Sequence, residues 1–227
     1  MSMDILRFEQ LPQGGFAGLL ERQFVTDRRV FKQPENTDAF DGMGNFVYLA
    51  DANFMPHGET GMHGHHEIDV LTVMVEGRLC HSGSLEHGQS LEAGSVQVQR
   101  AGAEGFQHNE INPDANGNHV IQLWVMPDKT GESAGYKTYQ PVIGELTQVY
   151  GGPQNQDKTF YSTTSIAIAN ATAGQTFSQQ GPVIAYLSAG SGQMNGQTIG
   201  ARTLVRSNVK LNFTASSNAQ LIFICAT

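Results

Sequence analysis

The stretch of sequence that decides the fold is residues 63–77, which read HGHHEIDVLTVMVEG. It opens with His63 and His65, continues as an expected strand over residues 69–75, and ends at the turn signal of residues 76–77. Residues i and i+2 of a β-strand project from the same face, so both imidazoles are predicted to point into the interior of one barrel. Two imidazoles on one face provide half of a metal site.

A second pair with the same spacing occurs in residues 107–110, QHNE, where His108 and Glu110 lie near the start of another strand. An HxH pair alone is often incidental, but an independent HxE pair on a second strand makes the pattern specific. Three histidines and one carboxylate suit a borderline divalent transition metal: iron, copper, nickel, manganese, cobalt or zinc. The predicted metal ligands are therefore His63, His65, His108 and Glu110, and they leave open positions on an octahedral metal for substrate and dioxygen.

Short alternating or β-branched runs recur along the chain between clusters of Gly, Asn and Ser, a pattern typical of a sandwich or barrel. Helical periodicity over about ten or more residues is not found, so an all-β protein is predicted. The expected strands cover residues 46–49, 69–75, 78–81, 95–99, 119–125, 165–169, 183–187, 192–194, 203–205, 211–214 and 221–225.

The polar, glycine-bearing segment 127–135 separates two series of strands and indicates a linker between domains. We predict an N-terminal metal-binding domain at 1–130, a linker at 131–140 and a C-terminal metal-free domain at 141–227. All eight histidines lie between positions 57 and 119, so only the first domain can hold a histidine-based site.

Composition narrows the class of protein further. A net charge of −8 with 15% charged residues argues against a nucleic-acid-binding surface. The longest apolar runs fall far short of the ~20 residues that cross a bilayer, and residues 1–7 lack the features of a secretory signal. The only cysteines, Cys80 and Cys225, are expected to be free in a reducing compartment, so we expect a cytoplasmic protein.

The motifs resemble those of the pirin family of bicupins. Residues 63–77 look like the family's HPHxxxExxTYxLEG segment, and residues 94–110, GSVQVQRAGAEGFQHNE, resemble its GDVQWMTAGxGIxHSE segment. Residues 123–127, LWVMP, are similar to its QLWVNLP-like strand. The resemblance covers residues 55–130 and implies two tandem jelly-roll-like cupin barrels, of which the second is metal-free. Carried over residue by residue, the family's four metal ligands fall on the same four residues that the spacing selects.

The chain departs from the family pattern at several places. Gly64 stands where a Pro is usual, Asp69 replaces a Glu, and Arg100 lies near a Met-Thr pair of the family. Residues 29–33 do not match the HTFSF-like segment of typical members. The first three differences leave the ligands untouched, whereas the last concerns the outer wall of the pocket and hence the substrate.

The resemblance implies a quercetin 2,3-dioxygenase-type enzyme that cleaves flavonol-like enediol substrates with O2, with Fe(II) as the first candidate metal. Glu110, as a ligand or after swinging free, could take the proton of the substrate's 3-hydroxyl group. The alternative is a metal- or redox-sensing regulatory protein that binds a protein partner, as some pirins do. An isomerase or hydrolase that uses zinc or manganese as a Lewis acid, and a vestigial metal site, are further readings.

The remaining polar residues near the motifs have separate expectations. Strand alternation turns His66 away from the face of His65. Glu67 and Asp69 fall on the face of His65 if the extended run continues unbroken, and either could then accept the second N–H of a ligand imidazole. The other histidines, which are expected at the surface or in the core, are His57, His81, His87 and His119.

Overall fold

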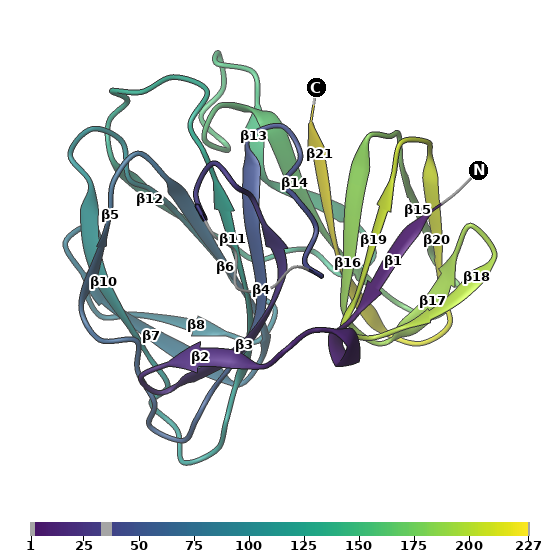
Figure 1. The fold of residues 1–227 in the computed structure, drawn as a ribbon, viewed down its shortest axis with the longest axis horizontal. Coiled ribbons are helices and arrows are strands. Elements are labelled where there is room, and N and C mark those ends of the chain that lie inside the picture. The colour runs from purple at the N-terminus through teal and green to yellow at the C-terminus, as the bar shows by residue number, and fades with distance from the viewer. Residues whose placement is uncertain (1–2, 33–37, 227) are drawn as a thin grey trace. The chain divides into compact units, whose positions relative to one another are not determined.

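The computed structural model describes residues 3–32 and 38–226, so Gln33 of the unmatched segment 29–33 lies outside them. Strands dominate the chain (Figure 1), and the one helical element among the described residues is the short 3-10 helix η1 (Phe8–Gln10). In this part of the chain, no helix is long and apolar enough to cross a membrane. The predicted all-β class is confirmed, and every predicted strand overlaps an observed one.

The chain divides into two compact units. The first, here called the histidine barrel, comprises residues 11–140, and the second, here called the C-terminal barrel, comprises the described residues 3–10 and 141–226. Each unit combines a four-stranded sheet with a larger sheet, and all strand pairs within the sheets are antiparallel. Two cupin-type barrels in one chain make the protein a bicupin.

The histidine barrel pairs its strands in a fixed order. Its seven-stranded sheet runs β12 (Gly135–Tyr139), β9 (Val96–Arg100), β6 (Asp69–Glu76), β11 (His119–Val125), β4 (Phe46–Phe54), β3 (Leu19–Thr26), β2 (Gly14–Phe16). Its four-stranded sheet runs β5 (His63–His65), β10 (Phe106–Ile111), β7 (Arg78–Gly83), β8 (Gln89–Glu92).

The C-terminal barrel has a closely similar layout. Its six-stranded sheet runs β1 (Asp4–Arg7), β19 (Thr203–Ser207), β16 (Val183–Ala189), β21 (Ala219–Ala226), β14 (Ser162–Ala171), β13 (Leu146–Gly152). Its four-stranded sheet runs β15 (Thr176–Gln179), β20 (Leu211–Ala215), β17 (Ser191–Met194), β18 (Gln197–Gly200).

Two short strands depart from the predicted domain bounds. β1 pairs with β19 through Ile5 and Val205, so the N-terminal strand belongs to the C-terminal barrel. β12 lies in the predicted linker, and it pairs with β9 through Lys137 and Val98. Each covers a sheet edge whose backbone N–H and C=O groups would otherwise lack partners. Such pairing depends on the three-dimensional edge, which local sequence composition does not record.

One row of side chains crosses the inner face of the seven-stranded sheet of the histidine barrel. Residues directly opposite each other in antiparallel strands share a face. The registers place Gln97 opposite Thr72, Thr72 opposite Gln122, Gln122 opposite Ala50, and Ala50 opposite Gln23. We call these five residues the polar row. Apolar clusters flank it and include Leu19, Phe54, Met74, Leu79, Val70 and Phe106.

Candidate metal centre

Strands β5 and β10 bring three histidines together. His108 lies opposite His63 in the register, and Phe106 lies opposite His65. The ring centroids are 4.5 Å apart for His63 and His108, and 5.1 Å apart for each pair that includes His65. One ligand atom from each of the three side chains lies within 4.8 Å of the others. Alternation along β5 and cross-strand pairing with β10 are sufficient to produce this group.

The three imidazoles fit a divalent transition metal. The Nε2 atoms of His63 and His108 are 3.0 Å apart, which is about the separation of two nitrogens that bind one metal at about 2.1 Å and at a right angle. His63 is oriented by its Nδ1, which lies 2.9 Å from the backbone oxygen of Gly61. His65 Nε2 is buried and has no hydrogen-bond partner among the described residues. A metal would satisfy this nitrogen and the facing pair together.

Burial keeps two of these imidazoles in the form that binds metals. It lowers the pKa of His65 to about 4, with His63 as a second cause. The pKa of His108 falls to about 2, first through burial and then through the nearby His63, His65 and His81. Both rings are therefore neutral at pH 7, and each neutral ring has a nitrogen lone pair to offer.

Glu110, the fourth predicted ligand, lies two residues after His108 on β10 and is buried at 1% exposure. Its Oε1 accepts hydrogen bonds from Thr72 Oγ1 and Gln97 Nε2, both at 2.7 Å, and its Oε2 accepts one from Gln122 Nε2 at 3.1 Å. The structure thus brings Glu110 to the polar row, and the close group contains only the three histidines.

The electrostatics of Glu110 follow from this environment. Burial raises its pKa to about 7, and the hydrogen bonds from Thr72, Gln97 and Gln122 act in the opposite direction. The three donors come from β6, β9 and β11, which all belong to the sheet that faces β10. Glu110 is therefore a buried carboxyl group at the base of the site, held by neutral donors.

The extended run after His65 is broken. Glu67 has a positive φ of 50°, which ends β5, and β6 then begins in the other sheet. Asp69 consequently forms a buried ion pair with Arg100 at 3.1 Å. Glu67 Oε1 accepts a hydrogen bond from the backbone N–H of Gly131 at 2.9 Å. The expected face of His65 thus does not continue to these two carboxylates.

The remaining histidines lie outside the close group. His81 is buried, its ring centroid is 5.5 Å from that of His108, and its Nε2 lies 2.9 Å from Gln99 Nε2. His57 is exposed in a turn. The other three contact atoms away from the metal site: His66 lies beside Ala103 O at 3.1 Å, His87 beside Ser82 Oγ at 3.2 Å, and His119 beside Asp51 Oδ2 at 2.9 Å. Both cysteines are free.

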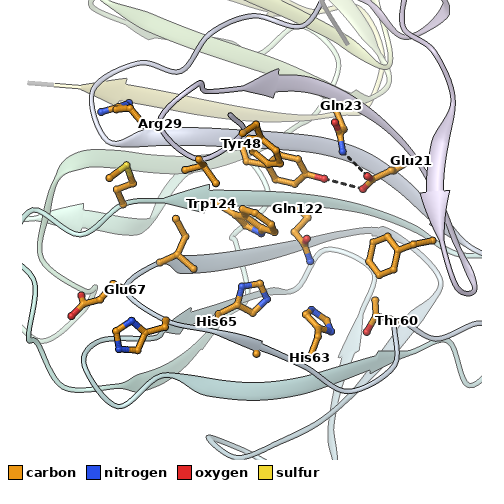
Figure 2. A pocket seen from close by; sticks show the side chains of 17 residues that line it. Glu21, Gln23, Arg29, Tyr48, Thr60, His63, His65, Glu67, Gln122 and Trp124 are labelled. Atoms are coloured by element: carbon orange, nitrogen blue, oxygen red, sulfur yellow. Dashed lines mark hydrogen bonds between the residues drawn. The ribbon is translucent and has the colours of Figure 1, made fainter. Parts of the chain in front are cut away.

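A pocket of about 690 Å³ in the histidine barrel gives access to the site. Figure 2 shows His63 and His65 on one side of it and Tyr48 with Glu21 on the other, with Trp124 and Gln122 between them. Aromatic rings form part of its lining. The centroid of Trp124 is 5.5 Å from His65 and 4.5 Å from Tyr48, and Phe31 stacks on both Tyr48 and Trp124. Flat aromatic molecules pack well against such surfaces.

The pocket also contains polar groups that the sequence motifs did not reveal. Glu21 Oε1 accepts a hydrogen bond from Gln23 Nε2 at 2.8 Å, and Glu21 Oε2 accepts one from Tyr48 OH at 2.9 Å. Arg29 lines the same pocket, but it donates to Asp27 at 2.8 Å. A signal for these residues was present in the strand alternation, because polar side chains at interior positions of apolar strands need partners.

Comparison with known proteins agrees with this fold. Residues 25–125 match the family model described as Pirin. The chain is 28% identical over 174 residues to a provisionally named quercetin 2,3-dioxygenase of Pseudomonas aeruginosa. The aligned region covers 71% of this chain and 75% of that protein. It is 33% identical over 78 residues to a quercetin 2,3-dioxygenase of Escherichia coli strain K12, and this match covers 34% of this chain and 33% of that protein.

Among solved structures, a bacterial pirin of Escherichia coli in complex with nickel(II) has the same fold. The TM-score is 0.81 at 18% sequence identity, and the superposition covers 99% of each chain. The likeness therefore extends over both barrels, although the sequence match to the E. coli quercetin 2,3-dioxygenase spans only 33% of that relative's length.

Proposed function

We propose that this protein is a metal-dependent dioxygenase that cleaves flavonol-like enediol substrates with O2, and the match of residues 25–125 to the Pirin family model supports this. The observation that carries the proposal is the close group of His63, His65 and His108, of which His63 and His65 line a pocket that also contains aromatic rings. The names of the relatives from Pseudomonas and Escherichia favour the same chemistry.

The proposed cofactor is one divalent transition metal, with Fe(II) as the first candidate. The three imidazoles would hold it, and Glu110 is the proposed fourth donor. When bound, the metal would supply open positions for dioxygen and for adjacent substrate oxygens. The nickel(II) complex of the E. coli pirin makes nickel the second metal to test.

The protein's own residues would bind and orient the substrate. Trp124 and Phe31 offer ring faces on which a flat flavonol can stack. Glu110 is the proposed acceptor for the proton of the substrate's 3-hydroxyl group. Gln97, Thr72 and Gln122 position its carboxyl group through the hydrogen bonds that they donate, so they are positioning residues in this reaction.

Oxygen uptake with quercetin tests the proposal. Protein loaded with Fe(II) or nickel should consume one dioxygen per quercetin, and both atoms of isotopically labelled dioxygen should appear in the products. His108→Leu should abolish uptake, whereas His87→Ala should retain it because His87 is exposed and lies outside both the close group and the pocket lining. No oxygen uptake with quercetin and a panel of related enediols, where a known dioxygenase is active, would contradict the proposal. Turnover without oxygen would indicate an isomerase or hydrolase instead.

A further inference from the structure

Glu21 is a carboxylate in an unusual setting. It lies on β3, is only 8% exposed and lines the pocket. Its side-chain hydrogen-bond partners among the described residues are the neutral groups of Gln23 and Tyr48. Buried carboxylates are costly unless a cation or several donors compensate them. The cation that shares the pocket, Arg29, forms its ion pair with Asp27.

The carboxylate retains capacity to bind a ligand. Two carboxylate oxygens offer about four acceptor positions, and the two hydrogen bonds fill only part of them. A structural role would not need the charge, because one neutral acceptor is enough for a tyrosine hydroxyl group. The charge makes Glu21 a stronger hydrogen-bond acceptor than a neutral residue would be, and a hydroxyl group of a ligand in the pocket could use this acceptor.

The position of Glu21 suits the far end of a flat ligand. Gln23, next to Glu21 along the same face of β3, lies opposite Ala50, which in turn lies opposite Gln122. Two strand spacings separate β3 from β11, or about 10 Å. Gln122 holds Glu110 near the histidines, and the tilted pair of rings of Tyr48 and Trp124 lies between the two ends, as Figure 2 shows.

We propose that Glu21 is a specificity residue that selects aromatic substrates with hydroxyl groups at the end remote from the metal. This inference rests on the proposed function, which supplies the flavonol-like ring system as the class of substrate. Glu21 accepts hydrogen bonds from phenolic hydroxyl groups and transfers no proton or electron. Ligands with methoxy groups there donate no hydrogen bond, and carboxylates meet like charge, so the pocket disfavours both.

Ligand binding without oxygen tests this role. Quercetin carries two hydroxyl groups on its pendant ring, and 3,5,7-trihydroxyflavone has the same skeleton with none there. We expect Glu21→Gln to weaken the binding of quercetin, measured by calorimetry of the metal-loaded protein, by about 10-fold or more. The binding of 3,5,7-trihydroxyflavone should change by less than about 2-fold. Fluorescence of Trp124, the sole tryptophan, reports pocket occupancy independently.

The matched control is Glu67→Gln, which removes a carboxylate from the same pocket by the same isosteric change. It should leave the ratio of the two affinities unchanged. A ligand-side measurement needs no variant: methylation of the two pendant hydroxyl groups of quercetin should weaken binding to the unaltered protein as much as Glu21→Gln does. Equal losses for both flavonols, an unchanged affinity for quercetin, or no flavonol binding at all would overturn the inference.

These binding results are separate from the test of catalysis. A preference for quercetin that depends on Glu21, found in a protein that takes up no oxygen, would refute the proposed reaction and leave the role of Glu21 intact. Oxygen uptake with the same rate and the same KM for both flavonols would support the reaction and refute the role of Glu21. The melting temperature of Glu21→Gln checks that the isosteric change has kept the fold.

Discussion

The histidine barrel and the C-terminal barrel share a strand order but differ in what fills them. β10 occupies the same place in its four-stranded sheet as β20 does in the other. The inward residues of β10 include His108 and Glu110, whereas those of β20 include Phe213 and Ala215. The architecture therefore forms with a hydrocarbon interior, and the polar interior of the first barrel is an addition that serves a site.

The larger sheets show the same contrast. In the histidine barrel, Gln97, Thr72 and Gln122 follow one another across β9, β6 and β11. The strands at the corresponding places in the C-terminal barrel, β19, β16 and β21, align Val205, Ala185 and Phe223. The polar side chains of the histidine barrel need hydrogen-bond partners, and each of the three donates to Glu110. The second set needs only close packing.

The largest expected effect comes from making β10 resemble β20. His108→Leu should reduce the metal affinity of the protein by more than about 100-fold, because it removes a ligand and not merely an outer partner. The free energy of unfolding of the metal-free protein should change by less than about 1.5 kcal/mol, since a buried imidazole is replaced by an apolar group of similar size. Elemental analysis and urea denaturation measure the two quantities.

His66→Ala is the control for that substitution, because it removes a histidine adjacent to a ligand but outside the close group. It should retain stoichiometric metal. Stoichiometric metal in His108→Leu would instead show that the site lies on other residues.

A second contrast concerns ion pairs in the two barrels. Asp69 faces Arg100 with exposed side-chain fractions of 1% and 8%, whereas Asp4 faces Arg206 with 57% and 35%. Asp69→Ala leaves the buried guanidinium with Glu132 as a carboxylate partner, at 2.8 Å, and should cost about 1–3 kcal/mol. Asp4→Ala should cost about 0–1 kcal/mol because water screens the exposed pair. Hydrogen exchange in β6 and in β19 reports each barrel, and equal losses would contradict the difference in burial.

Removal of the metal should change hydrogen exchange in the histidine barrel and leave the C-terminal barrel unaffected. A metal at 100 times its dissociation constant stabilises the form that binds it by about 2.7 kcal/mol. Amide hydrogen exchange in β10 should therefore accelerate by about 100-fold after chelation, and exchange in β20 should stay the same. The His108→Leu variant is the control, because a chelator should no longer change exchange in β10. Equal acceleration in β10 and β20 would show that the stabilisation is not confined to the histidine barrel.

The sequence was sufficient for the parts of the molecule that depend on local periodicity. The period of two in HxH and HxE placed His63 with His65 and His108 with Glu110, and pairing of β5 with β10 did the rest. The all-β class followed from the same alternation. These features are local because a strand turns successive side chains to opposite faces.

The parts that could not be predicted depend on register between distant strands. Nothing near Glu110 in sequence indicates that Thr72, Gln97 and Gln122 donate to it. The break at Glu67, which sends β6 to the other sheet, rests on one residue with a positive φ of 50°. The positions of β1 and β12 are likewise not predictable from local sequence, because these strands cover edges that form only after the sheets have assembled.

The smallest expected effect tests the polar row by reciprocal isosteric changes. Thr72 Oγ1 donates to Glu110 Oε1 at 2.7 Å and accepts from Gln97 Nε2 at 3.1 Å. Thr72→Val removes both hydrogen bonds while Gln97 still donates to Glu110, so the metal-free protein should lose about 1–2 kcal/mol of unfolding free energy. Val205→Thr places a hydroxyl group in the apolar cluster of the C-terminal barrel and should cost about 1–3 kcal/mol. Urea denaturation measures both.

Threonine and valine have almost the same shape, and the two substitutions exchange them in opposite directions. If packing alone determined stability, both substitutions would be nearly neutral. If hydrogen-bond partners also matter, each substitution should lower the free energy of unfolding, because each barrel receives a residue suited to the interior of the other. In a double-mutant cycle, Thr72→Val combined with Glu110→Leu should cost less than the sum of the single changes, since the partners are removed together. Additive losses would mean that Thr72 stabilises the barrel independently of Glu110.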